Sequence, residues 1–200
     1  MGEREGRRRP TRASRPSADP VQTALEFALE AHLGQARKDG RTAYIVHPVA
    51  VMRVLSSELG VTDPEILCAA LLHDVVEDTP VTLGRLRSRF GPRVTRWVEE
   101  LTLPSETHGP SVPDSVKTKL LVEAVGRITW PAVLVKLADR VDNLRDIANA
   151  RWSDRKRRAF QEQTRRILRT VAQRIKSDPP DFALEKPLRH ARRLVLDELR

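Results

Sequence analysis

The stretch that decides the fold runs from Ala69 to Asp78 and reads Ala-Ala-Leu-Leu-His-Asp-Val-Val-Glu-Asp. Its apolar half is typical of a buried helix, but side chains that bind metals or transfer protons interrupt it. A carboxylate in a protein interior is neutralised or paired, because burying it alone is costly. A histidine close to three carboxylates therefore favours a divalent cation over a packing role.

Helical spacing indicates what this stretch can offer to one ion. At 3.6 residues per turn, His73 and Glu77 share one helix face, and Asp74 and Asp78 share another about 100° away. Both His73 and Asp74 can reach one ion only near the edge of the helix. Other segments must therefore supply the remaining ligands.

Two residues elsewhere in the chain can supply them. His47 lies in the string Tyr44 to Pro48, and Asp139 lies in the string Lys136 to Arg140. Two imidazoles and two carboxylates, completed by water, suit manganese, iron or magnesium better than a closed zinc site. Open coordination positions indicate catalysis.

Each candidate also has a simpler interpretation. A histidine before a proline, such as His47, is often a turn or packing residue. Asp139 could pair with Lys136 three residues earlier on the same helix, and Glu77 and Asp78 could form a solvated helix end. The combination favours the metal site.

The composition limits the class of protein. The 200 residues, 40% hydrophobic and 32% charged, suit one soluble domain. No apolar run reaches the roughly 18 residues of a membrane helix. The Arg-rich start, residues 1–16, lacks the apolar segment of a secretory signal, so we expect a cytoplasmic protein. The single cysteine, Cys68, excludes an intramolecular disulfide and a cysteine-based zinc cluster.

The formal net charge is +9, with the basic excess spread over the N-terminal tail, Arg151 to Arg174 and Arg189 to Arg200. Aromatic residues make up only 4% of the chain, which disfavours a platform for stacking single-stranded nucleic acid. Attraction for a small, highly phosphorylated ligand explains the charge equally well, and so does a coding bias towards arginine.

Capping and breaking residues predict an all-α, single-domain helical bundle. Residues 1–17 are predicted to be a disordered basic tail, 18–177 the main domain and 178–200 a C-terminal helical extension. Residues 102–114 contain three prolines and a glycine, which predicts a loop. Helices are expected over these approximate ranges: 20–33, 48–60, 64–77, 82–91, 92–101, from 115, from 131, from 153 and after 180.

Four strings carry a resemblance to a known family. In order and spacing they resemble the RelA/SpoT-type hydrolase domain of the HD superfamily, over roughly Val21 to Trp152. The strings are His32 to Lys38, Tyr44 to Pro48, Leu71 to Asp78, and Lys136 to Asn143. No nucleotide-synthetase domain fits in the remaining residues, so we expect a stand-alone small alarmone hydrolase of HD-type helical fold.

The resemblance implies a role for each candidate residue. It makes His47, His73, Asp74 and Asp139 ligands of a divalent metal, with Mn2+ as the expected ion. It gives Glu77 and Asp78 the task of positioning and deprotonating the attacking water. It also implies a set of substrate contacts: Arg37, Lys38, Tyr44, Lys136 and Asn143. The family has an aromatic ring near the nucleotide where this chain has Ala159, beside Phe160, so base recognition is expected to differ.

The expected activity is removal of the 3′-pyrophosphate from guanosine tetra- or pentaphosphate, which makes a guanosine nucleotide the expected partner. Two alternatives stay open. One is phosphate removal from another nucleotide, such as NADPH or a deoxynucleotide. The other is a non-catalytic module that senses nucleotides or binds nucleic acid. The sequence predicts no membrane partner and leaves a homo-oligomer open.

Overall fold

The computed structural model describes residues 19–104, 112–147 and 152–200. Regular structure in these ranges is helical, apart from one isolated bridge between Ala36 and Ala43. The all-α prediction is therefore confirmed. The predicted tail, residues 1–17, lies outside the described residues, as does the central part, 105–111, of the predicted loop.

Most helices begin where the sequence predicts. Asp19 and Asp63 accept hydrogen bonds from Val21 N–H and Glu65 N–H, and Ser153 accepts one from Lys156 N–H. Such caps satisfy amide groups that lack a partner inside the helix. The elements are α1 (Pro20–Ala31), α2 (Val46–Arg53), the π-helical η1 (Val54–Glu58), α3 (Pro64–Leu72), α4 (Val75–Asp78), α5 (Leu83–Leu101), α6 (Asp114–Val125), α7 (Trp130–Ile147), α8 (Asp154–Ser177) and α9 (Phe182–Asp197).

The prediction of one continuous helix over residues 64–77 is wrong. Helix α3 ends at Leu72 and α4 begins at Val75, so His73 and Asp74 form the junction between two helices. At this junction the His73 ring hydrogen-bonds through Nδ1 to the carbonyl oxygen of Ala70, 2.8 Å away. A side chain that bonds the carbonyl three residues back competes with the regular helical hydrogen bonds. The decisive motif therefore ends a helix instead of continuing it.

Helix α5 has a kink where two separate helices are predicted. Gly91 leaves helical geometry, with φ of 80° and ψ of 175°, and Pro92 follows it. L-residues with a side chain rarely adopt this conformation, so a glycine is needed there. On the second half of the element, Trp97 is buried.

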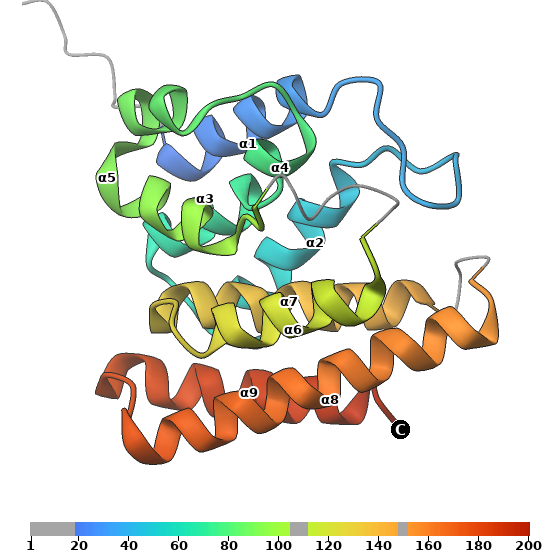
Figure 1. The fold of residues 1–200 in the computed structure, drawn as a ribbon. Coiled ribbons are helices and arrows are strands. Elements are labelled where there is room, and N and C mark those ends of the chain that lie inside the picture. The colour runs from blue at the N-terminus through green and yellow to red at the C-terminus, as the bar shows by residue number, and fades with distance from the viewer. Residues whose placement is uncertain (1–18, 105–111, 148–151) are drawn as a thin grey trace, which may run out of the picture.

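The helices form three layers (Figure 1). Helices α6 and α7 lie between an upper group, α1 to α5, and a lower pair, α8 and α9. Helix α7 packs against α2, α3, α5, α8 and α9, and most of its residues are buried. Any polar side chain on α7 that faces α2 and α3 therefore points into the protein interior.

The C-terminal helices complete this core. Ile167, Leu168 and Val171 of α8 are buried, while Phe160 and Ile175 are partly buried and pack against the core. Helix α9 lies against α7 and buries Leu188, Ala191 and Val195. Within the described ranges, no helix combines the length and the apolar character needed to cross a membrane.

Candidate metal centre and catalytic site

Four predicted ligands converge from three places in the fold. His47 lies in α2, His73 and Asp74 at the α3–α4 junction, and Asp139 in α7. Ligand atoms of His47, His73 and Asp139 all lie within 4.8 Å of one another. Asp74 Oδ2 lies 3.1 Å from His73 Nε2 and 3.5 Å from His47 Nε2. The packing of α2, α3 and α7 thus brings two imidazoles and two carboxylates to one point.

The hydrogen bonding of His73 leaves one ring nitrogen for a cation. A carbonyl oxygen only accepts, so Nδ1, which bonds the Ala70 carbonyl, carries the hydrogen. The other nitrogen, Nε2, is buried and has no hydrogen-bond partner among the described residues, although Asp74 Oδ2 faces it. In the neutral ring this arrangement places a lone pair opposite a carboxylate. A positive ion between the two atoms resolves that repulsion.

His47 is surrounded by acceptors in the same way. Its Nε2 lies 3.3 Å from Asp139 Oδ1, and its Nδ1 lies 2.6 Å from Asp142 Oδ2. Burial acts to lower the pKa of His47, but its hydrogen bonds to Asp139 and Asp142 outweigh burial and raise the pKa to about 9. This environment favours positive charge at the place where the candidate ligands meet.

The two aspartates are held in the form that binds metals. Burial acts to raise the pKa of Asp74, yet the neighbouring His73 and His47 bring it below its ordinary value. The pKa of Asp139 is also lowered, because Lys136 and His47 outweigh the effect of its burial. Ionised carboxylates and neutral imidazoles are the forms that bind a divalent cation. The two carboxylates therefore fit such an ion, and His47, whose pKa is about 9, gives up a proton when the ion binds.

Tyr44 connects the candidate ligands to the candidate base. Its hydroxyl oxygen lies 2.6 Å from Asp74 Oδ2 and 2.9 Å from Asp78 Oδ2. Burial, followed by the charge of Asp74, raises the pKa of Tyr44 well above its ordinary value, so the hydroxyl remains a donor. Glu77, which directly precedes Asp78 in α4, accepts a hydrogen bond from Leu103 N–H. Asp78 is therefore linked to the candidate ligand Asp74 through Tyr44, whereas Glu77 contacts the backbone of Leu103.

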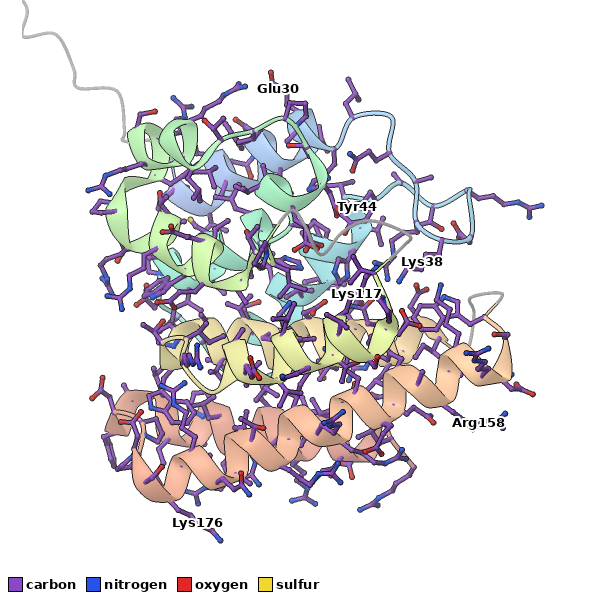
Figure 2. All side chains as sticks on the ribbon, in the orientation of Figure 1. Glu30, Lys38, Tyr44, Lys117, Arg158 and Lys176 are labelled. Carbon is purple, nitrogen blue, oxygen red and sulfur yellow. The ribbon has the colours of Figure 1, made fainter. Side chains whose placement is uncertain are left out.

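The other predicted substrate contacts have partners within the protein. Arg37 binds Asp146 at 2.8 Å and Lys136 lies 3.4 Å from Asp139 Oδ2. Asn143 donates to the side chain and the carbonyl of Asp139. Lys38 lies over the ring of Trp152, 4.5 Å from its centroid. In Figure 2, Lys38 and Tyr44 lie on the side where the upper helices approach α6 and α7.

The structure adds residues that sequence reasoning missed. Asp142 contacts a candidate ligand directly, and its position three residues after Asp139 on the same helix was an available signal. Gln35 donates to the Asp78 carbonyl and contacts His32, whose ring lies 4.7 Å from that of Tyr44.

An aromatic residue was also missed. Trp152 lies below Lys38 and Lys156, with ring centroids 4.5 Å and 4.7 Å from the two ammonium groups, and its ring meets Phe160 edge to face. The sequence signal was an aromatic residue directly before the Ser153 cap. Trp152 and Phe160 therefore provide aromatic rings at this end of α8, where Ala159 has none.

The fold and the His-Asp cluster define an HD domain. The model of the HD domain family matches residues 24–176, and the chain therefore belongs to this family. Among curated proteins it is 39% identical over 150 residues to the human guanosine-3′,5′-bis(diphosphate) 3′-pyrophosphohydrolase MESH1, covering 73% of this chain and 81% of the human one. The corresponding zebrafish protein is 44% identical over 124 residues, 62% of this chain and 66% of its own.

A bacterial enzyme and a solved structure agree with these relatives. The guanosine-3′,5′-bis(diphosphate) 3′-pyrophosphohydrolase of Aquifex aeolicus is 36% identical over 173 residues, which are 84% of this chain and 24% of that longer protein. A solved structure, described as a metazoan ortholog of SpoT that hydrolyses ppGpp, superposes with a TM-score of 0.71 at 31% identity. That match covers 90% of this chain and 97% of the other.

Proposed function

We propose that this protein is a metal-dependent hydrolase that removes the 3′-pyrophosphate from guanosine tetra- or pentaphosphate, giving GDP or GTP and pyrophosphate. The observation that carries the proposal is the convergence of His47, His73, Asp74 and Asp139, including the buried Nε2 of His73, which has no hydrogen-bond partner among the described residues. The relatives named for this activity support the substrate. Cytoplasmic location is part of the proposal, because guanosine nucleotides are cytoplasmic metabolites.

The four converging residues are the proposed ligands of the ion, and Mn2+ is the proposed ion. A divalent ion bound there lowers the pKa of a water molecule and stabilises negative charge on phosphoryl oxygens. Four protein ligands of mixed nitrogen and oxygen type leave room for water and substrate in the usual shell of such an ion.

The remaining residues are proposed to handle the proton and the substrate. Glu77 and Asp78 orient the attacking water, and a carboxylate accepts its proton. Tyr44, donating to Asp74 and Asp78, keeps a ligand and a candidate base in a fixed relation. Water adds to the pyrophosphoryl group, the bond to the 3′ oxygen breaks and pyrophosphate leaves; the proton that the carboxylate took from water passes to the 3′ oxygen, which stays on the nucleotide as a hydroxyl.

Basic and aromatic side chains near the cluster suit a phosphorylated nucleotide. Lys38 and Lys156 bring two positive charges to the ring of Trp152. Burial, followed by the charge of Lys156, lowers the pKa of Lys38. An anion bound beside Lys38 offsets that repulsion. We propose that this group of residues receives the nucleotide, with the base against the aromatic ring.

The decisive experiment incubates the purified protein with Mn2+ and guanosine tetraphosphate and measures pyrophosphate release. We expect turnover that stops when a chelator removes the metal and is absent in Asp139→Ala. NADPH and deoxynucleotides, assayed in parallel, cover the alternative substrates. Robust turnover of one of these, without pyrophosphate release from guanosine tetraphosphate, would contradict the substrate assignment. Binding without turnover of any substrate would favour the nucleotide-sensing alternative.

A further inference from the structure

Two aspartates of α7 hold the two ring nitrogens of His47. Asp139 Oδ1 lies 3.3 Å from Nε2, and Asp142 Oδ2 lies 2.6 Å from Nδ1. Residues three apart on a helix lie on the same side, so both carboxylates reach towards α2. His47 itself is only 3% exposed. Each ring nitrogen of His47 therefore has a carboxylate nearby inside the protein.

The contact with Asp142 determines which nitrogen carries the hydrogen. An ionised carboxylate only accepts hydrogen bonds, and the contact of His47 with Asp142 is shorter than its contact with Asp139, so in the neutral ring Nδ1 keeps the hydrogen and Nε2 is left with its lone pair. That lone pair points towards the side where Asp139 and Asp74 lie. In metalloproteins, a carboxylate that accepts from the outer nitrogen of a histidine ligand fixes the orientation of its ring and increases its basicity.

We propose that Asp142 is a positioning residue of the metal centre, which holds His47 with Nε2 towards the ion. This inference rests on the proposed metal site. Asp142 does not itself reach the reacting atoms: it acts through His47. For His73, the carbonyl oxygen of Ala70 accepts the corresponding hydrogen bond from Nδ1, at 2.8 Å. Both imidazoles of the centre are thus oriented in the same sense, one by a backbone group and one by an aspartate.

Arg37 in turn contacts Asp142. Its Nη2 lies 3.5 Å from Asp142 Oδ2 and 2.8 Å from Asp146 Oδ2, and only 11% of its side chain is exposed. These groups line a cavity of about 200 Å3 that also contains Asp39 and Thr42. The cationic Arg37 offsets the two carboxylates beside it. Its proposed effect is therefore on the metal centre, in addition to the substrate contact expected from the sequence.

Metal affinity tests the inference directly. Metal-free protein is titrated with Mn2+ in a calorimeter, using wild type, Asp142→Asn, Asp142→Ala and Asp39→Asn. We expect Asp142→Ala to weaken Mn2+ binding by roughly 10- to 100-fold, the range found when such supporting partners are removed. Asp142→Asn is expected to lose less, because its amide oxygen still accepts from Nδ1–H. Asp39→Asn removes the same charge from the same cavity without touching His47, and its affinity should stay within about twofold of wild type.

A second measurement separates orientation from general stability. In protein loaded with diamagnetic Mg2+, NMR of the ring nitrogens should place the hydrogen of His47 on Nδ1 in wild type. In Asp142→Ala the ring is expected to lose its orientation and no longer to hold Nε2 on the ion, so the hydrogen should be found on Nδ1 and Nε2 in a mixture. Thermal unfolding of the metal-free variants reports on the fold. If Asp142→Ala does not fold, Asp142→Asn decides the question by the same two measurements.

The outcomes are distinguishable from failure of the proposed function. Unchanged Mn2+ affinity in folded Asp142→Ala overturns the role of Asp142 and leaves the metal site intact. An equal loss in Asp39→Asn also overturns it, because the effect is then one of overall charge. If wild type binds no Mn2+, the metal site and this inference both fail. If wild type binds Mn2+ but does not hydrolyse guanosine tetraphosphate, only the substrate proposal fails.

Discussion

At the scale of single residues, the proposed ligands and the proposed proton-transfer groups have different surroundings. Asp139 lies among the imidazoles, and Lys136 and Asn143 hold its carboxylate. Glu77 instead bonds to the backbone of Leu103. The two kinds of carboxylate should therefore respond differently to substitution.

We expect Asp139→Ala to abolish metal binding and turnover together, because it removes a ligand from the centre of the cluster. Glu77→Gln should leave the metal bound and slow turnover by roughly 10²- to 10⁴-fold, the usual contribution of a general base. Elemental analysis after gel filtration, combined with a pyrophosphate assay, checks both. Turnover that survives in Asp139→Ala would contradict the ligand assignment.

Tyr44→Phe provides a separate residue-scale prediction. The variant keeps the ring packed on His32 but removes the donor shared by Asp74 and Asp78. Hydrogen bonds to charged groups contribute about 1.5–3 kcal/mol, so kcat should fall by about tenfold or more. Because the pKa of Tyr44 is raised, the deficit should be constant from about pH 6 to pH 9. A deficit that disappears at high pH would show that deprotonation of Tyr44 matters instead.

At the scale of elements, breaks in helices matter as much as the helices. On a continuous helix, His73 and Asp74 would point about 100° apart. At the α3–α4 junction, His73 Nε2 and Asp74 Oδ2 lie 3.1 Å apart. Both residues keep dihedral angles in the αR region, and their side chains meet at the end of α3, as two proposed ligands of one ion require. The hydrogen bond from His73 to Ala70 provides a local reason for the break.

The kink in α5 allows a matched test of backbone geometry. Gly91 has φ of 80° with nothing within 4 Å of an added Cβ, so Gly91→Ala meets no clash and reports on backbone strain alone. We expect a loss of about 1–3 kcal/mol in the free energy of unfolding. Gly84, in the first turn of the same element, has ordinary geometry, and Gly84→Ala should be neutral or stabilise by up to about 1 kcal/mol. Urea denaturation measures both, and equal effects would contradict the role assigned to Gly91.

At the scale of the whole molecule, α7 connects the site to the C-terminal part. It carries Asp139 and Asp142 towards α2, and its other side packs against α9. Arg145, near its end, binds Glu58 of η1 at 2.7 Å and Glu198, just after α9, also at 2.7 Å. The predicted division between a main domain, 18–177, and an extension, 178–200, stays a prediction, although α9 shares the core.

Arg145→Ala should weaken this connection in a pH-dependent way. Half-exposed ion pairs contribute little, so we expect a loss of about 1 kcal/mol or less at pH 7. The hydrogen bond from Arg145 lowers the pKa of Glu58 from its ordinary value of 4.5. The stabilisation is therefore complete above pH 4.5 and is lost as the pH falls through the lowered folded-state pKa. Urea titrations of wild type and variant at several pH values check this, and a difference that grows in acid would contradict it.

The sequence by itself determined the helical class and most helix starts, and it predicted the candidate ligand set. Those features are local: an aspartate or serine cap satisfies amides within one turn, and a buried histidine next to carboxylates is unusual in any short window. The order and spacing of the four strings also predicted the family to which the chain belongs.

Only the tertiary structure decided how these residues meet. The contacts of Asp139 and Asp142 with the two ring nitrogens of His47, and the contact of Arg37 with Asp142, depend on side chains far apart in the chain. Local propensity carries no information on such pairs, because their energy exists only once α2, α3 and α7 are packed together. The expected substrate contacts of Arg37, Lys136 and Asn143 therefore acquired partners within the protein that no sequence pattern indicated, except Asp139 for Lys136.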